Sequence, residues 1–207
     1  MYLVEEKRLK RMKDILAKRQ KDLSVFMDDV KNEHNFSAII RTCDAVGVLN
    51  VYYRYSLKRE IPINEGITLG AHKWVFLKKV ENSYDFLKKK KEEGFQIVIT
   101  YLSKDSINFR KVDYTKPTII AVGNEMSGVS EDILELSDHK VIIPMYGMVQ
   151  SLNVSVATAV VLYEAQRQRE EKGLYSKPQL SQEEVDKILK KWAIEDVIKA
   201  KKRKDNL

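Results

Sequence analysis

The stretch VIIPMYGMVQSLNVSVATAVVLYEAQRQR, Val141 to Arg169, joins a short apolar strand to a long helix. The run that ends at Pro144 is typical of a buried strand, and Gly147 marks a turn. We expect the helix to start near Ser151. Its first three turns are apolar on nearly every side, which is typical of a helix that is packed all round. These apolar positions are Leu152, Val154, Val156, Ala157, Ala159, Val160, Val161 and Leu162.

Two polar residues, Ser151 and Asn153, head this otherwise apolar helix. One interpretation is helix capping, because Ser is a good N-cap whose hydroxyl accepts a hydrogen bond from a free amide of the first turn. The other interpretation is that both side chains face a functional site. The stretch alone favours capping, so the choice depends on the rest of the chain.

Length and composition favour one sizeable α/β domain with helical extensions. The chain has 207 residues, and no Pro/Gly/Ser-rich linker divides it. Its longest apolar runs fall short of the roughly 20 residues that a membrane-spanning helix needs. The start, MYLVEEKRLKRMK, is charged where a secretory signal would be apolar. These features predict a cytoplasmic protein.

Cysteine and histidine usage argues against disulfides and metals. Cys43 is the only cysteine, which excludes an internal disulfide. The histidines His34, His72 and His139 stand too far apart in the sequence to form a spaced metal-ligand motif. We therefore predict that the protein binds no structural metal.

Basic residues concentrate at both ends of the chain. Lys and Arg number 37 against 30 Asp and Glu, for a net charge of +7. Residues 1–21 hold eight Lys or Arg against three acids, and the chain closes on KAKKRKDNL. A charge run is often only a solvated helix face, but cationic ends around an apolar middle favour contact with a nucleic-acid backbone. We expect a basic helical arm over 1–21, a central domain over 22–170 and a basic helical extension over 171–207.

Apolar strands alternate with helices between these arms, which predicts an α/β fold with a mainly parallel sheet covered by helices on both faces. In such sheets ligands bind in the loops at the carboxyl ends of the strands. No GxGxxG or GxxxxGK[ST] loop occurs there, so a nicotinamide-binding or P-loop function is disfavoured. The predicted strands are VLNVYYRY, WVFL, FQIVITYL, TIIAVG and HKVIIP, and the loops that stand out are ITYLSKD, GNEMSG and PMYGMVQSLN.

Individual residues carry weak signals when each is taken alone. Glu125 follows a predicted strand, where its carboxylate would lie in the ligand crevice or simply interact with a nearby helix or water. Arg41 lies off the apolar stripe of its helix, which by itself favours a solvated surface position. Cys43 belongs to that apolar stripe and is expected to be a core residue.

Three blocks taken together are far more specific. They run over residues 32–48, 119–134 and 143–164. In their order, spacing and amino-acid sequence they resemble the motifs of the SpoU/TrmH family of SPOUT RNA methyltransferases. The resemblance covers residues 32–169. The basic arms resemble those of family members that methylate the ribose 2'-hydroxyl of guanosine 18 in tRNA. The blocks read NEHNFSAIIRTCDAVGV, IIAVGNEMSGVSEDIL and IPMYGMVQSLNVSVATAVVLYE.

The resemblance implies a tRNA ribose 2'-O-methyltransferase that uses S-adenosylmethionine and forms a homodimer. The family's last strand, loop and helix pass through a deep C-terminal trefoil knot that holds the cofactor, which would explain a helix that is apolar all round. Ser151 and Asn153 would then face the active site. Two alternatives remain: action on rRNA or another tRNA position, or a non-catalytic RNA-binding protein of the same fold.

The resemblance also implies site residues. The reaction aligns a ribose hydroxyl with the methyl carbon of a sulfonium and removes one proton. Arg41 would either hold the phosphate beside the target ribose or abstract the proton, and the first role is favoured because an arginine is effectively always protonated. The implied catalytic set is Asn35, Arg41, Glu125, Ser151 and Asn153, and the implied cofactor-binding set is Thr100, Gly123, Ile143 and Leu152.

Overall fold

A computed structural model describes residues 5–56, 63–124 and 128–204. Its seven strands form one sheet in the order β3-β2-β1-β6-β4-β7-β5, and every neighbouring pair is parallel. The strands are β1 Gln20–Asp28, β2 Val48–Arg54, β3 Phe76–Lys79, β4 Gln96–Thr100, β5 Ile107–Asn108, β6 Thr118–Val122 and β7 His139–Ile142.

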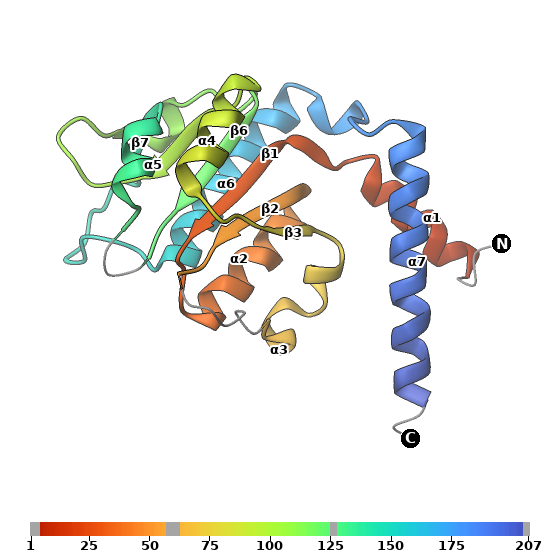
Figure 1. Ribbon diagram of the computed structural model, residues 1–207. Helices are drawn as coiled ribbons and strands as arrows, with labels where there is room; N and C mark the ends of the chain where they lie inside the picture. Colours follow the sequence, from red (N-terminus) through yellow and green to blue (C-terminus); the bar gives the residue numbers. More distant parts are fainter. Residues whose placement is uncertain (1–4, 57–62, 125–127, 205–207) are drawn as a thin grey trace.

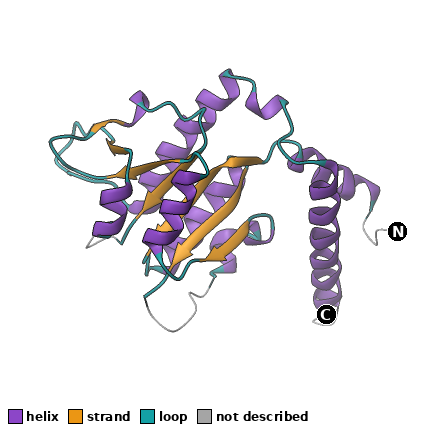
Figure 2. Cartoon of the chain, turned by 45° about the horizontal axis from the view of Figure 1, so that its top comes forward, coloured by secondary structure: helices purple, strands orange, loops and turns teal. Residues whose placement is uncertain are grey.

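Helices cover both faces of this sheet, as predicted. Helices α2 and α6 lie on one face and α4 and α5 on the other (Figure 1, Figure 2). The α-helices are α1 Glu6–Leu16, α2 Glu33–Ala45, α3 Glu65–Thr68, α4 Ser83–Glu92, α5 Glu131–Leu136, α6 Val154–Glu171 and α7 Gln182–Lys204. Short 3₁₀ turns are η1 Ala71–Lys73, η2 Phe109–Lys111 and η3 Leu174–Ser176.

The interior strand β1 is not among the strands predicted from the sequence. The predicted arm reached Lys21, whereas α1 ends at Leu16 and β1 begins at Gln20. The strand is buried on both faces: Val25 packs in the cluster beneath α2 and α6, and Phe26 packs in the cluster beneath α4 and α5. A strand covered on both faces shows a continuous apolar run instead of alternation.

Helix α2 carries both Arg41 and Cys43. The side chain of Asn32 accepts hydrogen bonds from the amides of His34 and Asn35, which caps the first turn. The stripe that includes Phe36 and Cys43 is buried, and burial raises the pKa of the Cys43 thiol. Cys43 is therefore a core residue, as predicted.

Helix α6 differs in two respects from what the sequence predicts. It begins at Val154 with Asn153 as its N-cap, whose side chain accepts from the Ser155 amide at 2.9 Å, so Ser151 is not the cap. The helix is also not packed all round within one chain, because Val156 is 48% exposed and Tyr163 is 52% exposed. The opposite side, which includes Leu162, packs in the core. One partly apolar face of α6 therefore remains uncovered.

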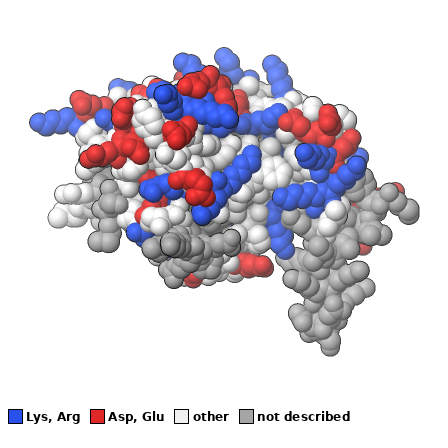
Figure 3. All heavy atoms as spheres, in the orientation of Figure 1, with Lys and Arg blue, Asp and Glu red and all other residues white. Residues whose placement is uncertain are grey.

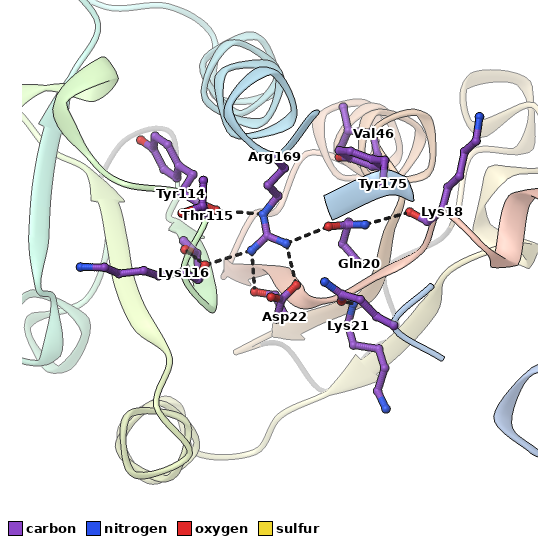
Figure 4. A network of polar contacts seen from close by, with 12 residues as sticks. Lys18, Gln20, Lys21, Asp22, Val46, Tyr114, Thr115, Lys116, Arg169 and Tyr175 are labelled. Atoms are coloured by element: carbon purple, nitrogen blue, oxygen red, sulfur yellow. Dashed lines mark hydrogen bonds and ion pairs between the residues drawn. The ribbon is translucent and has the colours of Figure 1, made fainter. Parts of the chain in front are cut away.

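The far end of α6 is fastened to β1 by a buried arginine (Figure 4). Arg169 is fully buried, and its guanidinium donates to the Gln20 side chain at 2.9 Å and to the Asp22 carboxylate at 2.6 Å. It also donates to the carbonyl oxygens of Tyr114 and Lys116, both at 2.9 Å. One side chain thus connects α6, the start of β1 and the segment that enters β6.

The two terminal helices pack against each other beside the sheet (Figure 1). Met12 and Leu16 of α1 join Leu189 and Trp192 of α7 in a separate apolar cluster. Among the residues that the structure describes, no helix is long and apolar enough to cross a membrane. The arms are thus a packed helical pair whose inner faces are apolar.

Candidate active site

The predicted cofactor residues line up at one edge of the sheet. Thr100 ends β4, Gly123 directly follows β6, and Ile143 directly follows β7. Strand β4 lies between β6 and β7, with Ile99 opposite Ala121 in one pair and Thr100 opposite Val141 in the other. Carboxyl ends of neighbouring parallel strands form the usual ligand edge of such a sheet.

The fourth predicted cofactor residue, Leu152, is half-buried in the loop that leads from β7 to α6. Ile143, at the start of the same loop, is also half-buried and packs against the main core. The edge therefore offers apolar side chains and main-chain polar groups. This composition suits the purine ring and methionyl chain of an adenosyl cofactor, which need apolar walls and a few oriented polar groups.

The loop after β6 needs a glycine at its first position. Asn124 and Gly128 exchange backbone hydrogen bonds of 3.0 and 2.9 Å, which folds the loop back onto Gly123. A Cβ atom at position 123 would lie 2.1 Å from the Gly128 carbonyl oxygen and 2.4 Å from the Val129 nitrogen. Both are backbone atoms, so the loop itself would have to move to admit a side chain.

We expect Gly123→Ala to weaken S-adenosylmethionine binding by about tenfold or more, because relieving an overpacked contact typically costs about 1–3 kcal/mol. Isothermal calorimetry with the cofactor measures this weakening. Gly66→Ala is the matched control, since a Cβ there meets only the Asn64 side-chain oxygen at 3.3 Å. Equal cofactor affinity in both variants would contradict this account of the loop.

Two predicted catalytic residues meet across the fold. Asn35 lies in the first turn of α2 and Asn153 heads α6, and the Asn153 amide nitrogen donates to the Asn35 side-chain oxygen at 3.0 Å. The Asn153 oxygen is held by the Ser155 amide and hydroxyl, at 2.9 and 2.6 Å. Capping therefore fixes the orientation of the Asn153 amide, so capping and a place in the site are compatible.

Arg41 and Ser151 lie on the surface. The Arg41 guanidinium donates to the Ile67 carbonyl oxygen at 3.3 Å and, within the described residues, forms no ion pair. Ser151 is exposed and makes no hydrogen bond to the part of the chain that the structure describes. Both side chains can thus reach an external anion. Glu125, the fifth predicted catalytic residue, lies outside the described residues.

Asp28 and Asp29 are structural partners of this site, and neither is among the residues predicted from the sequence. The buried carboxylate of Asp28 accepts from the Arg54 Nε at 2.6 Å and from the Ser130 amide at 3.3 Å, and the hydrogen bond to Arg54 raises the pKa of that arginine. The Asp29 carbonyl accepts from the Asn124 side chain at 3.1 Å. Both ends of the Gly123–Ser130 loop are therefore tied to the end of β1.

Asp29 also has a left-handed backbone, with φ of 56°. This conformation is uncommon for a residue other than Gly, and Asp and Asn tolerate it best. The turn redirects the chain from β1 toward α2, which carries Asn35 and Arg41. An aspartate pair at the end of a strand is a recognisable signal, but it could not be used while β1 itself was unpredicted.

Comparison with known proteins agrees with this geometry. Residues 22–163 match the SpoU rRNA Methylase family and residues 167–206 match the SpoU rRNA methylase C-terminal family. The tRNA (guanosine(18)-2'-O)-methyltransferase of Aquifex aeolicus is 67% identical, over 98% of this chain and 96% of the relative. The protein of the same name from Thermus thermophilus is 47% identical, over 90% of this chain and 96% of the relative.

Solved structures give the same result. The A. aeolicus TrmH/SpoU tRNA modifying enzyme superposes with a TM-score of 0.88 over 93% of this chain and 98% of that one. The SpoU methyltransferase AviRb from Streptomyces viridochromogenes, in complex with the cofactor AdoMet, is 28% identical with a TM-score of 0.65, over 73% of this chain and 62% of that one. By sequence and by fold, the chain belongs to the SpoU rRNA Methylase family.

Proposed function

We propose that this protein transfers a methyl group from S-adenosylmethionine to the ribose 2'-hydroxyl of guanosine 18 in tRNA, leaving S-adenosylhomocysteine. The observation that carries the proposal is 67% identity, over nearly the whole of both chains, to a relative named for that reaction. Two features of the fold support the proposal: the adjacent carboxyl ends of β4, β6 and β7, and the hydrogen bond between Asn35 and Asn153.

The residues divide the work between cofactor and RNA. S-adenosylmethionine supplies, when bound, a methyl group on a positively charged sulfur. Thr100, Gly123, Ile143 and Leu152 would hold it at the sheet edge, mainly through main-chain groups and apolar contact. Orientation of the attacking hydroxyl is the principal task left to the protein, because alignment alone removes much of the barrier to such a transfer.

Arg41 would position the ribose by gripping the adjoining phosphate. Its surface position and single carbonyl contact leave most of the guanidinium donors available to an external phosphate. Ser151 would orient that guanidinium or the phosphate, while Asn35, Asn153 and Glu125 would keep the site in shape. Proton abstraction by Arg41 is the less favoured role, since the guanidinium normally stays protonated.

The uncovered apolar surface supports a homodimer. Tyr146, Met148 and Val149 in the loop before α6 are 98%, 100% and 60% exposed, and Val156 and Tyr163 extend this surface along the helix. Exposed apolar patches of this kind mark interaction sites. We propose that a second copy covers them and that the segment forms the family's trefoil knot. A protein that sediments as a monomer at micromolar concentration would contradict the dimer.

The direct test of function is to incubate the protein with a tRNA transcript and labelled cofactor and to map the methylated nucleotide. Methylation at guanosine 18 supports the proposal, and methylation of another tRNA position or of rRNA alone would replace it. Binding of RNA without any methyl transfer would leave an RNA-binding protein. A tRNA substrate would place the enzyme in the cytoplasm.

We also propose that the basic arms supply RNA affinity and no chemistry. Lys and Arg side chains, with acids interspersed, are spread over the face in Figure 3. Deleting the arms would uncover Leu49 and Phe76, which pack in the α1–α7 cluster, so charge neutralisation is the cleaner test. The exposed lysines suitable for this are Lys7, Lys13 and Lys18.

Replacing these three lysines together with Gln is expected to weaken tRNA binding. The slope of log affinity against log salt should become shallower by about 0.7–0.9 for each phosphate that is no longer neutralised, because fewer counterions are released. Filter binding across a salt series measures both effects, and calorimetry should give unchanged cofactor affinity. An unchanged salt slope would make the arms ordinary surface helices.

A further inference from the structure

A pocket of about 190 Å³ lies where α1 meets α7 and the end of α2. Arg8 and Arg11 come from α1, Asp44 from α2, Trp192 from α7, and Trp74 directly follows η1. Asp44 lies nine residues beyond Asn35, about 14 Å along the helix at 1.5 Å per residue. The pocket is therefore separate from the proposed methyl-transfer site.

The pocket wall is fixed by a buried arginine. Arg19, 1% exposed, donates to the Val48 carbonyl at 3.1 Å and to the Trp74 carbonyl at 3.0 Å, and it forms an ion pair with Asp44. Its guanidinium also lies 5.7 Å from the ring of Trp192. The positions of Asp44 and both tryptophans thus depend on one buried, hydrogen-bonded cation. The pocket wall is therefore pre-organised.

The side chains that face the pocket offer three kinds of interaction. The ring of Trp74 meets Trp192 edge-on at 5.1 Å and carries the Arg8 guanidinium over it at 5.3 Å. Arg11 is exposed beside them. Asp44 uses one oxygen for Arg19, and a carboxylate has about four acceptor positions, so it can accept further hydrogen bonds.

These three features match a nucleotide. Single-stranded RNA bases stack on aromatic rings and guanidinium planes, and their edges are read by hydrogen bonds. A carboxylate only accepts hydrogen bonds, and the Watson–Crick edge of guanine presents adjacent N–H donors, whereas adenine presents a ring-nitrogen acceptor there. The volume is below the roughly 300 Å³ at which drug-sized ligand sites begin, so one ring system fits.

We propose that this pocket binds one unstacked guanine nucleotide of the tRNA substrate, other than the nucleotide that is methylated. The base replaces the Arg8 guanidinium over Trp74, and Asp44 accepts from its N–H groups. Arg8 and Arg11 then pair with its phosphate. This inference rests on the proposed function for the identity of the RNA, but the pocket's preference for guanine is a property of its own residues.

The pocket can be observed by itself, because the chain has two tryptophans and both line it. Intrinsic tryptophan fluorescence of the full-length protein is followed during titration with GMP, AMP or inorganic phosphate. GMP is expected to change the emission saturably, AMP at least about tenfold more weakly, and phosphate not at all. Lack of any GMP response up to about 10 millimolar, or an equal AMP response, would overturn the proposal.

Matched variants on α1 separate a pocket from general positive charge. Arg11→Gln should weaken GMP binding by about fivefold or more, because the phosphate loses one charged partner. Lys10→Gln removes the same charge from a neighbouring exposed position that does not line the pocket, and it should leave GMP binding unchanged. If both variants weakened GMP binding equally, the effect would be one of general positive charge, and the proposal of a specific pocket would be refuted.

Failure of this proposal is distinguishable from failure of the proposed function. The titration requires neither cofactor nor methyl transfer. If guanosine 18 is methylated but GMP leaves the fluorescence unchanged, the pocket alone is wrong. If GMP binds as described but the protein methylates another RNA, the function alone is wrong.

Discussion

Arg41→Lys and Arg41→Ala are both expected to reduce methyl transfer by about a hundredfold or more. A planar guanidinium grips phosphate with two parallel hydrogen bonds, and lysine cannot reproduce this geometry. Removing one such interaction from the transition state costs about 3 kcal/mol. Within the described residues the Arg41 side chain holds only the Ile67 carbonyl, at 3.3 Å, so neither variant should disturb the fold.

Single-turnover methylation of tRNA at saturating enzyme measures this reduction, with cofactor binding measured separately by calorimetry. The lysine variant is the informative one because it keeps the positive charge. Activity within about threefold of the unmodified protein would mean that Arg41 is a solvated surface residue. A fall in cofactor affinity would instead assign it to support of the cofactor site.

The sheet was predictable where strands and helices alternate with clear boundaries. The segments around β2, β4 and β6 are apolar runs, and each was expected; β2 and β4 each follow a helix, and β6 precedes one. The strand β1 was not predicted because basic residues occur both along the arm and at the start of the strand, at Lys18 and Lys21. Charge continuity suggested one helical arm, whereas burial on both faces determines the strand.

The site was only partly predictable. Asn35 and Asn153 are 118 positions apart, so no local pattern predicts their 3.0 Å hydrogen bond. Their selection came from family motifs, and their contact comes from the packing of α2 on α6. Capping and a place in the site do not exclude each other at Asn153. Its side-chain oxygen caps the helix, and its side-chain nitrogen donates to Asn35.

Two arginines on α6 allow a matched test of burial. Arg169 is fully buried and joins α6 to Asp22 and three other residues, whereas Arg167, two residues earlier, is exposed and pairs with Glu164 and Glu171 on its own helix. Both are charged and hydrogen-bonded. Removing Arg169 leaves several buried acceptors without a donor, whereas removing Arg167 leaves the buried Glu164 with its hydrogen bond from Gln168 at 2.8 Å.

Arg169→Met is expected to lower the free energy of unfolding by about 3–5 kcal/mol, because the side chain of Gln20 and the carbonyl oxygens of Tyr114 and Lys116 lose their donor and Asp22 loses its ion-pair partner. The melting temperature should fall by about 6–20 °C for a chain of this size. Arg167→Met should lower it by clearly less, since its pair with the exposed Glu171 contributes little and the buried Glu164 keeps its hydrogen bond from Gln168. Thermal unfolding followed by circular dichroism measures both variants under the same conditions.

The two variants should also differ little in methyl transfer at about 25 °C, because Arg169 lies sixteen residues from Asn153, about 24 Å along α6. A large drop in melting temperature with nearly normal activity assigns Arg169 to the joint between α6, β1 and the entry to β6. Equal melting temperatures for the two variants would show that this joint contributes no stability. Loss of activity in a folded Arg169→Met protein would instead mean that the joint transmits its geometry along the helix to the Asn35–Asn153 contact.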